Sequence, residues 1–226
     1  MKITFYGQST FGIESNNANL ITDPFITAND LAKDKVDIQT LKADYILVTH
    51  AHQDHILDVE AIAKNTGALI VTNNEIANYF GDKGLKAHGL NFGGSKKFDF
   101  GIAKYVVAQH SSSFPDGSYG GNPGGFVLQI DGKTIYIAGD TALTMDMKLI
   151  AEEFDLDLAI LPIGDNYTMG YKDAVKASDF VNCDKIIGCH YDTFPAIEID
   201  HDAAQKAFKD AGKELHLMEI GSSMEL

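Results

Sequence analysis

Four side chains that can bind a metal ion occur within six residues, in the stretch His50-Ala51-His52-Gln53-Asp54-His55. In extended backbone His50 and His52 point to the same side, so their imidazoles can converge on one ion. Asp54 comes where the following helix should begin, and a helix cap is therefore the alternative role for it. The density of potential ligands favours a metal site over that alternative.

Similar residues follow other predicted strands. The apolar run 45–48 precedes the histidine motif, and three more apolar runs each lead into a single residue that can bind a metal: 105–109 before His110, 135–139 before Asp140, and 186–189 before His190. Strands of an open α/β sheet carry their sites just beyond their carboxyl ends. Residues far apart in sequence can therefore meet at one edge of the sheet.

Composition restricts the class of ligand. The chain has 226 residues and a formal charge of −14, and all 18 of its cationic side chains are lysines. Without arginine it cannot form a bidentate guanidinium clamp, and a basic track for long nucleic acid is not expected. We expect a small anionic molecule as the substrate, and the sequence is compatible with an oligomer.

The same features predict compartment and domain organisation. We find no linker, so a single domain over residues 1–226 is the simplest account. Residues 1–7 predict a first strand rather than a signal peptide, and no apolar run has membrane length, so we expect a cytoplasmic protein without a membrane partner. Cys183 and Cys189 fit a reducing compartment; they could pair, but alternation along the strand predicts Cys189 in the core.

Hydrophobic periodicity predicts an α/β fold with a mixed or parallel sheet and helices outside it. An antiparallel meander is expected over 2–6, 10–14 and 19–22, and a hairpin over 126–130 and 133–138. Residues 26–43 predict a surface loop with a short helix. Further strands are expected at 68–72, 91–98, 102–108 and 158–163, and helices at 56–65, 74–80, 143–154, 172–181 and 202–211.

Several residues have two plausible roles. Asp23 could orient a ligand histidine or simply form an Asp-Pro turn. The glycine-rich loop 111–125 could gate a substrate or form a wide turn.

Asp165 could support a ligand and Tyr167 could reach a substrate, while Tyr167, Tyr191 and His88 are candidates for the general acid. We expect a loop position for His88, a helix start for His201 and the last strand for His216, all three outside the metal site.

The collected ligands are five histidines and two aspartates: His50, His52, His55, His110, His190, Asp54 and Asp140. This set suits two divalent ions, Zn²⁺ first and Mn²⁺ as the alternative, because the same N and O ligands bind both. With a bridging hydroxide the site would carry a net charge of about +1, which suits an anionic ester, and the ions would supply that hydroxide as the nucleophile. We expect Asp54 and Asp140 to be the catalytic carboxylates.

The ligand pattern, with Asp140 after a glycine and His190 last, resembles the metallo-β-lactamase fold superfamily of metal-dependent hydrolases. The resemblance implies a four-layer αββα sandwich with a dimetal site at one edge of the two sheets. It also implies that one ion is held by His50, His52 and His110, and the other by Asp54, His55 and His190, with Asp140 bridging them.

Residues 20–24, 138–141 and 162–170 are most similar to the small stand-alone hydrolases related to the ascorbate-6-phosphate lactonase group. This resemblance implies a hydrolase and leaves the substrate open between a phosphodiester and a lactone. The chain lacks the large insertion after Asp140 that nucleic-acid-cutting branches carry, and it has His52 where flavodiiron oxygen reductases typically use Glu.

Two other functions compete with a binuclear hydrolase. A mononuclear iron oxygenase or other redox enzyme on the same scaffold would not need Asp54, His55 and His190, so their presence argues against it. A non-catalytic metal-binding protein with a relict site would usually have lost ligands, and this chain retains all seven.

Overall fold

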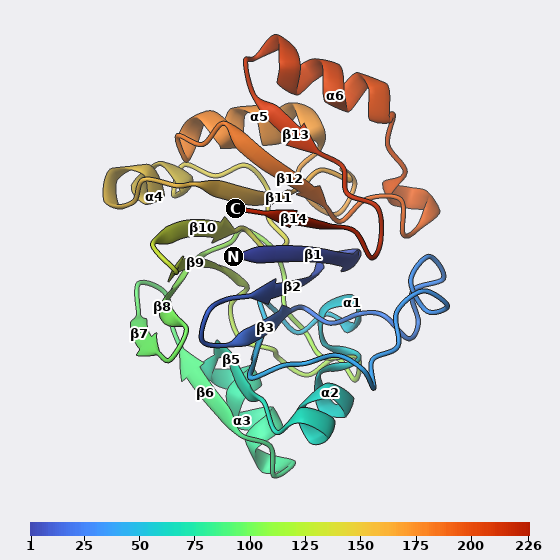
Figure 1. Cartoon of the computed structure of the whole chain (residues 1–226), viewed down its shortest axis with the longest axis vertical. Helices are drawn as coiled ribbons and strands as arrows, with labels where there is room; N and C mark the ends of the chain where they lie inside the picture. Colours follow the sequence, from blue (N-terminus) through green and yellow to red (C-terminus); the bar gives the residue numbers. More distant parts are fainter.

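Two seven-stranded sheets face each other in the computed structural model, which describes residues 1–226 (Figure 1). The first sheet has the order β14 (Ser223–Glu225), β1 (Lys2–Gly7), β2 (Thr10–Glu14), β3 (Asn19–Thr22), β4 (Tyr45–Leu47), β5 (Leu69–Asn73) and β6 (Ala87–Leu90). The second has the order β13 (Glu214–His216), β12 (Lys185–Cys189), β11 (Leu158–Pro162), β10 (Lys133–Ile137), β9 (Gly124–Ile130), β8 (Gly101–Val107) and β7 (Ser95–Phe98).

Helices cover the outer face of each sheet. The first sheet is covered by α1 (Gln53–Ile56), α2 (Val59–Thr66) and α3 (Asn74–Asp82), and the second by α4 (Met147–Glu153), α5 (Tyr171–Phe180) and α6 (His201–Asp210). Figure 1 shows α5 and α6 at the opposite end of the molecule from α2 and α3. A short 3₁₀ helix, η1 (Pro195–Ile197), precedes α6. The predicted four-layer αββα architecture is confirmed.

Alternation along the strands explains the layers. In β10, Ile135 and Ile137 pack between the two sheets, while Tyr136 points to the helices of the second sheet. β4 divides in the same way, with Tyr45 and Leu47 between the sheets and Ile46 toward α2 and α3. Successive side chains of a strand point to opposite faces, so strands that are apolar on both faces can lie in the middle of the sandwich.

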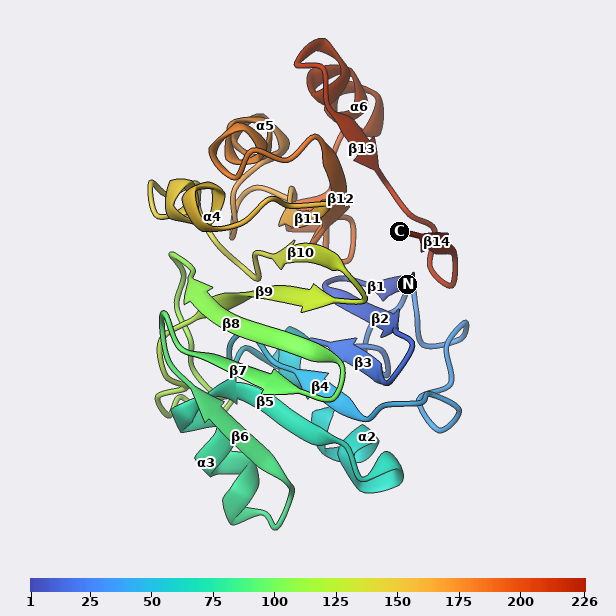
Figure 2. The ribbon, with the colours of Figure 1, turned by 60° about the vertical axis from the view of Figure 1, so that its left-hand side comes forward.

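Strand direction brings the proposed ligands to one edge. β3 to β6 are mutually parallel, and so are β10 to β13. β8 and β10 both pair antiparallel with β9, so they run in the same direction (Figure 2). The carboxyl ends of β8, β10 and β12 therefore share one edge of the second sheet.

Most predicted elements are confirmed, including the meander and the hairpin, but several boundaries were wrong. The helix expected over 56–65 is two helices, α1 and α2, separated at Leu57 and Asp58. Asp58 is held by the preceding loop, since its carboxylate accepts hydrogen bonds from the backbone N–H groups of Ile26 and Thr27. The helix expected from residue 143 begins only at Met147, and residues 26–43 form turns without a helix.

His88 was also misplaced, because it lies on strand β6 rather than in a loop. Strand β14 was not predicted, and His216 on β13 is therefore not on the last strand. β14 has only three residues, and its partner β1 is at the other end of the chain. Such a pairing leaves no local pattern in the sequence.

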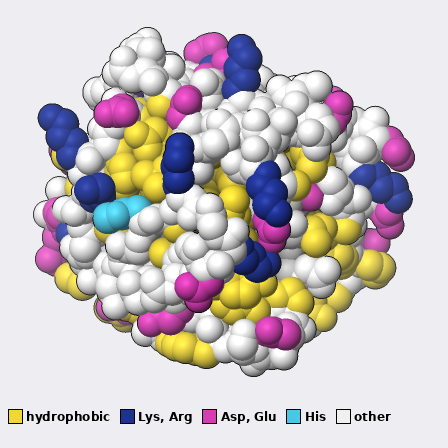
Figure 3. Space-filling view, turned by 90° about the horizontal axis from the view of Figure 1, so that it is seen from below, with side chains coloured by type: hydrophobic (Ala, Val, Ile, Leu, Met, Phe, Trp, Pro, Cys, Tyr) yellow, Lys and Arg dark blue, Asp and Glu magenta, His cyan; other side chains and the backbone are white.

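The surface shows no basic track at the end of the molecule seen from below. Figure 3 shows lysines on that face separated by acidic, apolar and other side chains. Among the six α-helices, none combines the length and the apolar character required to cross a bilayer.

Candidate metal centre

All seven residues proposed as metal ligands meet at one edge of the two sheets. They form two groups, one of His50, His52 and His110 and the other of Asp54, His55, Asp140 and His190. Within each group the potential ligand atoms all lie within 4.8 Å of one another. The loops after β4, β8, β10 and β12 supply them, together with the first turn of α1. The structure thus brings together residues that are up to 140 positions apart in sequence.

The first group is built from two imidazoles of the motif and one from the other sheet. The Nε2 atom of His50 lies 3.0 Å from Nδ1 of His52. The His110 ring packs edge-on to both, with centroids 5.1 and 5.0 Å away. His50 is fully buried, whereas His52 and His110 are partly exposed. This group therefore has one side open to solvent.

The second group is more deeply buried. Nε2 of His190 lies 3.3 Å from Oδ2 of Asp54 and 3.0 Å from Oδ2 of Asp140. Nε2 of His55 lies 3.5 and 3.4 Å from the same two oxygens. His190 has a φ of 55°, a left-handed conformation that is uncommon for a residue with a side chain and is often found at functional sites.

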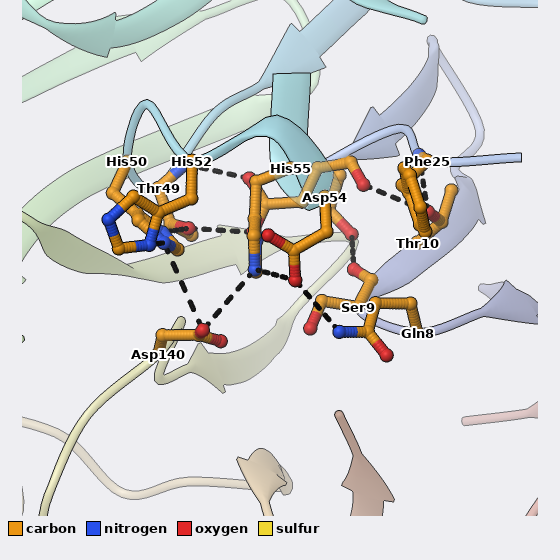
Figure 4. Close-up of polar contacts among 12 residues, drawn as sticks. Gln8, Ser9, Thr10, Phe25, Thr49, His50, His52, Asp54, His55 and Asp140 are labelled. Atoms are coloured by element: carbon orange, nitrogen blue, oxygen red, sulfur yellow. Dashed lines mark hydrogen bonds and ion pairs between the residues drawn. The ribbon is translucent and has the colours of Figure 1, made fainter. Parts of the chain in front are cut away.

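Asp140 lies between the two groups. Its Oδ2 atom is 3.9 Å from Nε2 of His50 and 3.6 Å from Nε2 of His110, in addition to its contacts with His55 and His190. Four histidine nitrogens from both sheets thus surround one carboxylate oxygen. Figure 4 shows His50, Asp54, His55 and Asp140 converging on this region.

Asp23 orients two of the histidines. Its Oδ2 atom accepts a hydrogen bond from Nδ1 of His55 at 2.9 Å and another from the Thr49 hydroxyl at 2.7 Å. Because the hydroxyl proton of Thr49 goes to Asp23, its oxygen is free to accept from Nδ1 of His50, 3.1 Å away. In their neutral forms, both histidines would then present an unprotonated Nε2 to a bound ion. The predicted contact of Asp23 with a histidine is confirmed.

Gln8 connects the centre to the first hairpin. Its Nε2 atom donates to Oδ2 of Asp54 at 2.9 Å, and its backbone carbonyl accepts from the N–H of His190 at 2.9 Å. Gln8 is buried, and its backbone has a φ of 53°. One residue thus holds a carboxylate from the first sheet and a backbone amide from the second.

Mutual interactions set the charges of the metal-free site. Burial acts to raise the pKa of Asp54, but the positive charge of His55 and the close contacts with His190 and His55 hold it well below the usual range. Burial acts to lower the pKa of His190, but Asp140 and Asp54 raise it to about 9. Burial and neighbouring histidines lower the pKa of His50. Metal-free, the site therefore neutralises its two carboxylates with protonated His55 and His190.

The donor atoms fit divalent ions. Two ligands on a tetrahedral ion with bonds of about 2.0–2.1 Å lie about 3.3 Å apart. The separations of 3.0–3.5 Å among His50, His52, His55, His190 and the aspartates bracket that value. In addition, Nε2 of His55 and Oδ1 of Asp140 are buried without a hydrogen-bond partner. Buried polar atoms are normally paired, so these two unpaired atoms on proposed ligands are consistent with a role in binding a metal ion.

Comparison with known proteins agrees with this chemistry. Residues 2–190 match the family model described as the β-lactamase superfamily domain. A UPF0173 metal-dependent hydrolase of Christiangramia forsetii is 66% identical over 226 residues, which is 100% of both chains, and YtkL of Bacillus subtilis, of the same description, is 44% identical over 100% of both. The chain belongs to the UPF0173 metal-dependent hydrolases of the metallo-β-lactamase superfamily.

A solved structure supports the same family. Igni18, a metallo hydrolase from the archaeon Ignicoccus hospitalis, has a TM-score of 0.90 and 34% sequence identity, covering 100% of this chain and 98% of its own. The expected metallo-β-lactamase fold is therefore confirmed for this UPF0173 protein.

A cleft of about 430 Å³ opens onto the candidate metal centre of this UPF0173 hydrolase. Asp54, Asp140 and His190 are among its lining residues. Tyr167 lines the cleft, as expected for a residue that reaches the substrate, whereas Tyr191 and His88 do not. Of the three candidates for the general acid, the structure therefore retains Tyr167 alone.

Other polar residues named from the sequence lie away from the centre. Asp165 is exposed and accepts a hydrogen bond from the neighbouring Asn166 N–H, so its predicted supporting role is wrong. His201 begins α6, as expected, and contacts Asp192. Sequence analysis missed Gln8, which follows β1 at the same edge as the ligands. His110 and Asp140 were identified because each directly follows an apolar strand. The same criterion would have identified Gln8 if Gln had been counted among the relevant polar residues.

Proposed function

We propose that this protein is a binuclear metal-dependent hydrolase acting on a small anionic ester, either a phosphodiester or a lactone. The observation that carries the proposal is the position of Asp140, whose Oδ2 atom lies within 4 Å of Nε2 atoms from both ligand groups. A single-ion site would not need a carboxylate in that position. Zn²⁺ or Mn²⁺ would be the ions.

His50, His52 and His110 would hold one ion, and Asp54, His55 and His190 the other, with Asp140 between them. The ions would lower the pKa of a shared water and stabilise negative charge on the attacked carbonyl or phosphoryl oxygen. The protein keeps the ligands in place: Asp23 and Thr49 fix the histidine tautomers, and Gln8 holds Asp54. The cleft then limits the size of the substrate.

The test is hydrolysis of an activated aryl phosphodiester and of a sugar-acid lactone by Zn- and Mn-reconstituted protein. Asp140→Ala should abolish turnover and lower the metal content. Asp165→Asn is the matched control, because Asp165 is exposed and its φ of 61° suits Asn equally well. A fully active Asp140→Ala protein would refute the proposal.

Metal analysis distinguishes the proposed hydrolase from the competing redox enzyme. Two redox-inert ions per chain support the binuclear hydrolase, whereas one iron per chain would indicate an oxygenase on the same scaffold. Cleavage of the diester alone would identify a phosphodiesterase, and opening of the lactone alone a lactonase.

A further inference from the structure

The walls of the cleft differ chemically from its floor. Besides the histidines and aspartates, and the polar Gln53 and Ser111, the cleft is lined by four apolar side chains, Phe25, Ala28, Tyr167 and Phe194. Phe194 is 36% exposed and Tyr167 59% exposed, which is high for large apolar side chains. Exposed apolar surface beside a polar centre is typical of a ligand site.

The two phenylalanines form one wall that the backbone holds in place. Their ring centroids are 6.1 Å apart and the rings are tilted by 45°. The N–H of Phe25 donates to the Thr10 hydroxyl at 2.9 Å. The carbonyl of Phe194 accepts from the N–H of Ile197 at 3.0 Å, at the start of η1. Neither ring is therefore carried on an unconstrained loop.

Asp192 closes the loop that carries Phe194. Its carboxylate accepts from the N–H of Ile199 at 3.0 Å and contacts the His201 ring. Its own N–H donates to the carbonyl of Ile197 at 2.9 Å. This loop begins directly after His190, so Phe194 lies only four residues along the backbone from a proposed metal ligand.

Tyr167 lies on a separate tight turn. A bridge between Gly164 and Gly170 closes the base of this turn, and Asp165 and Asn166 have φ values of 61° and 55°. Left-handed residues in succession produce a sharp reversal. The turn lets Tyr167 reach the cleft from the end of β11.

The cleft contains no cationic anchor apart from the centre itself. None of its lining residues is a lysine, and the chain has no arginine. The other polar lining residues, Gln53 and Ser111, are uncharged, so a substrate with a second anionic group, such as a sugar phosphate or a nucleoside diphosphate, would have no cationic side chain to pair with that group. Burying an unpaired charge there is unfavourable.

We infer that the ester cleaved by this enzyme carries one uncharged aromatic or similarly flat apolar group, bound by Phe25, Phe194 and Tyr167, and no second anionic group. The inference rests on the proposed hydrolase function and narrows its substrate class. A cleft of about 430 Å³ has room for one ring beside the reacting group.

Binding tests the inference without turnover. Phenylphosphonate, methylphosphonate and phosphonoacetate share one anionic head and differ in the rest, and their affinity for Zn-loaded protein can be measured calorimetrically. Burying a ring should make phenylphosphonate bind about tenfold more tightly than methylphosphonate. Phosphonoacetate should bind no more tightly than methylphosphonate. In Phe194→Ala the preference should fall to about twofold or less, with zinc content unchanged.

Leu149→Ala is the control, because Leu149 is 60% exposed and does not line the cleft. It should keep the full preference. Equal affinity for the phenyl and methyl compounds, tightest binding of phosphonoacetate, binding of none of the three, or a preference that survives Phe194→Ala would each overturn the inference. A retained phenyl preference without hydrolysis of any ester would instead refute the proposed function alone.

Discussion

Replacing Asp23 by Asn should weaken metal binding as well as the fold. Its carboxylate accepts three hydrogen bonds, from the N–H and the hydroxyl of Thr49, each at 2.7 Å, and from Nδ1 of His55 at 2.9 Å. Asn has one acceptor oxygen and one NH₂ donor group. Whichever way the amide turns, at least one buried donor then faces another donor.

The size of the effect follows from these bonds. An unsatisfied buried donor costs about 1–3 kcal/mol, which lowers the melting temperature of a protein of this size by roughly 2–12 °C. The histidines also lose their fixed tautomers, and loss of such an orienting group typically costs about 10–100-fold in metal affinity. We therefore expect both a lower melting temperature without metal and a zinc Kd raised about 10–100-fold.

Asp58→Asn separates the two effects. Asp58 is equally buried, and its carboxylate also accepts three hydrogen bonds, from the N–H of Ile26 and from the N–H and hydroxyl of Thr27. None of these partners is a proposed ligand. The Asp58→Asn variant should lose at most comparable stability, because its amide oxygen can still accept from both N–H groups, and should keep its zinc Kd within about twofold, as measured by competition with a chromophoric chelator. Equal losses of affinity in the two variants, or none in Asp23→Asn, would refute the reasoning.

Two further predictions concern protons and the glycine-rich loop. At pH 7.5, loading the metal-free protein should release about three protons, two from His55 and His190, whose pKa values are raised, and one from the shared water, and the histidine share should diminish as the pH rises past about 9. Calorimetry in two buffers of different ionisation enthalpy measures it, and no release would contradict the charge assignment. Gly120→Ala should cost about 1–3 kcal/mol in urea denaturation, because the added Cβ would lie 2.3 Å from that of Ala51. Gly81→Ala in α3, where a Cβ meets nothing, should stabilise by about 0.5–1 kcal/mol, and equal effects at the two glycines would contradict the packing argument.

The sequence alone determined most of the strands and the ligand types. Runs such as 45–48 and 135–138 are apolar on both faces, and only a strand between two layers buries both, so a sheet with helices outside it could be predicted, whereas the four-layer sandwich was implied by the resemblance to a known family. The histidine motif is local, and residues two apart on extended backbone must share a side. The convergence of His50 and His52 therefore needed no tertiary information.

Tertiary structure decided which distant residues meet. Asp140 lies near four histidines only because β8 and β10 run in the same direction beside β9, a pairing that depends on the whole sheet. The same holds for Gln8 and Phe194, which carry no motif and become part of the site through contacts made across long sequence separations. Hydrophobic periodicity reports which face of an element is buried, but not which element covers it. The ligands could therefore be identified from the chain, whereas the groups that orient them and the walls that select a substrate could not.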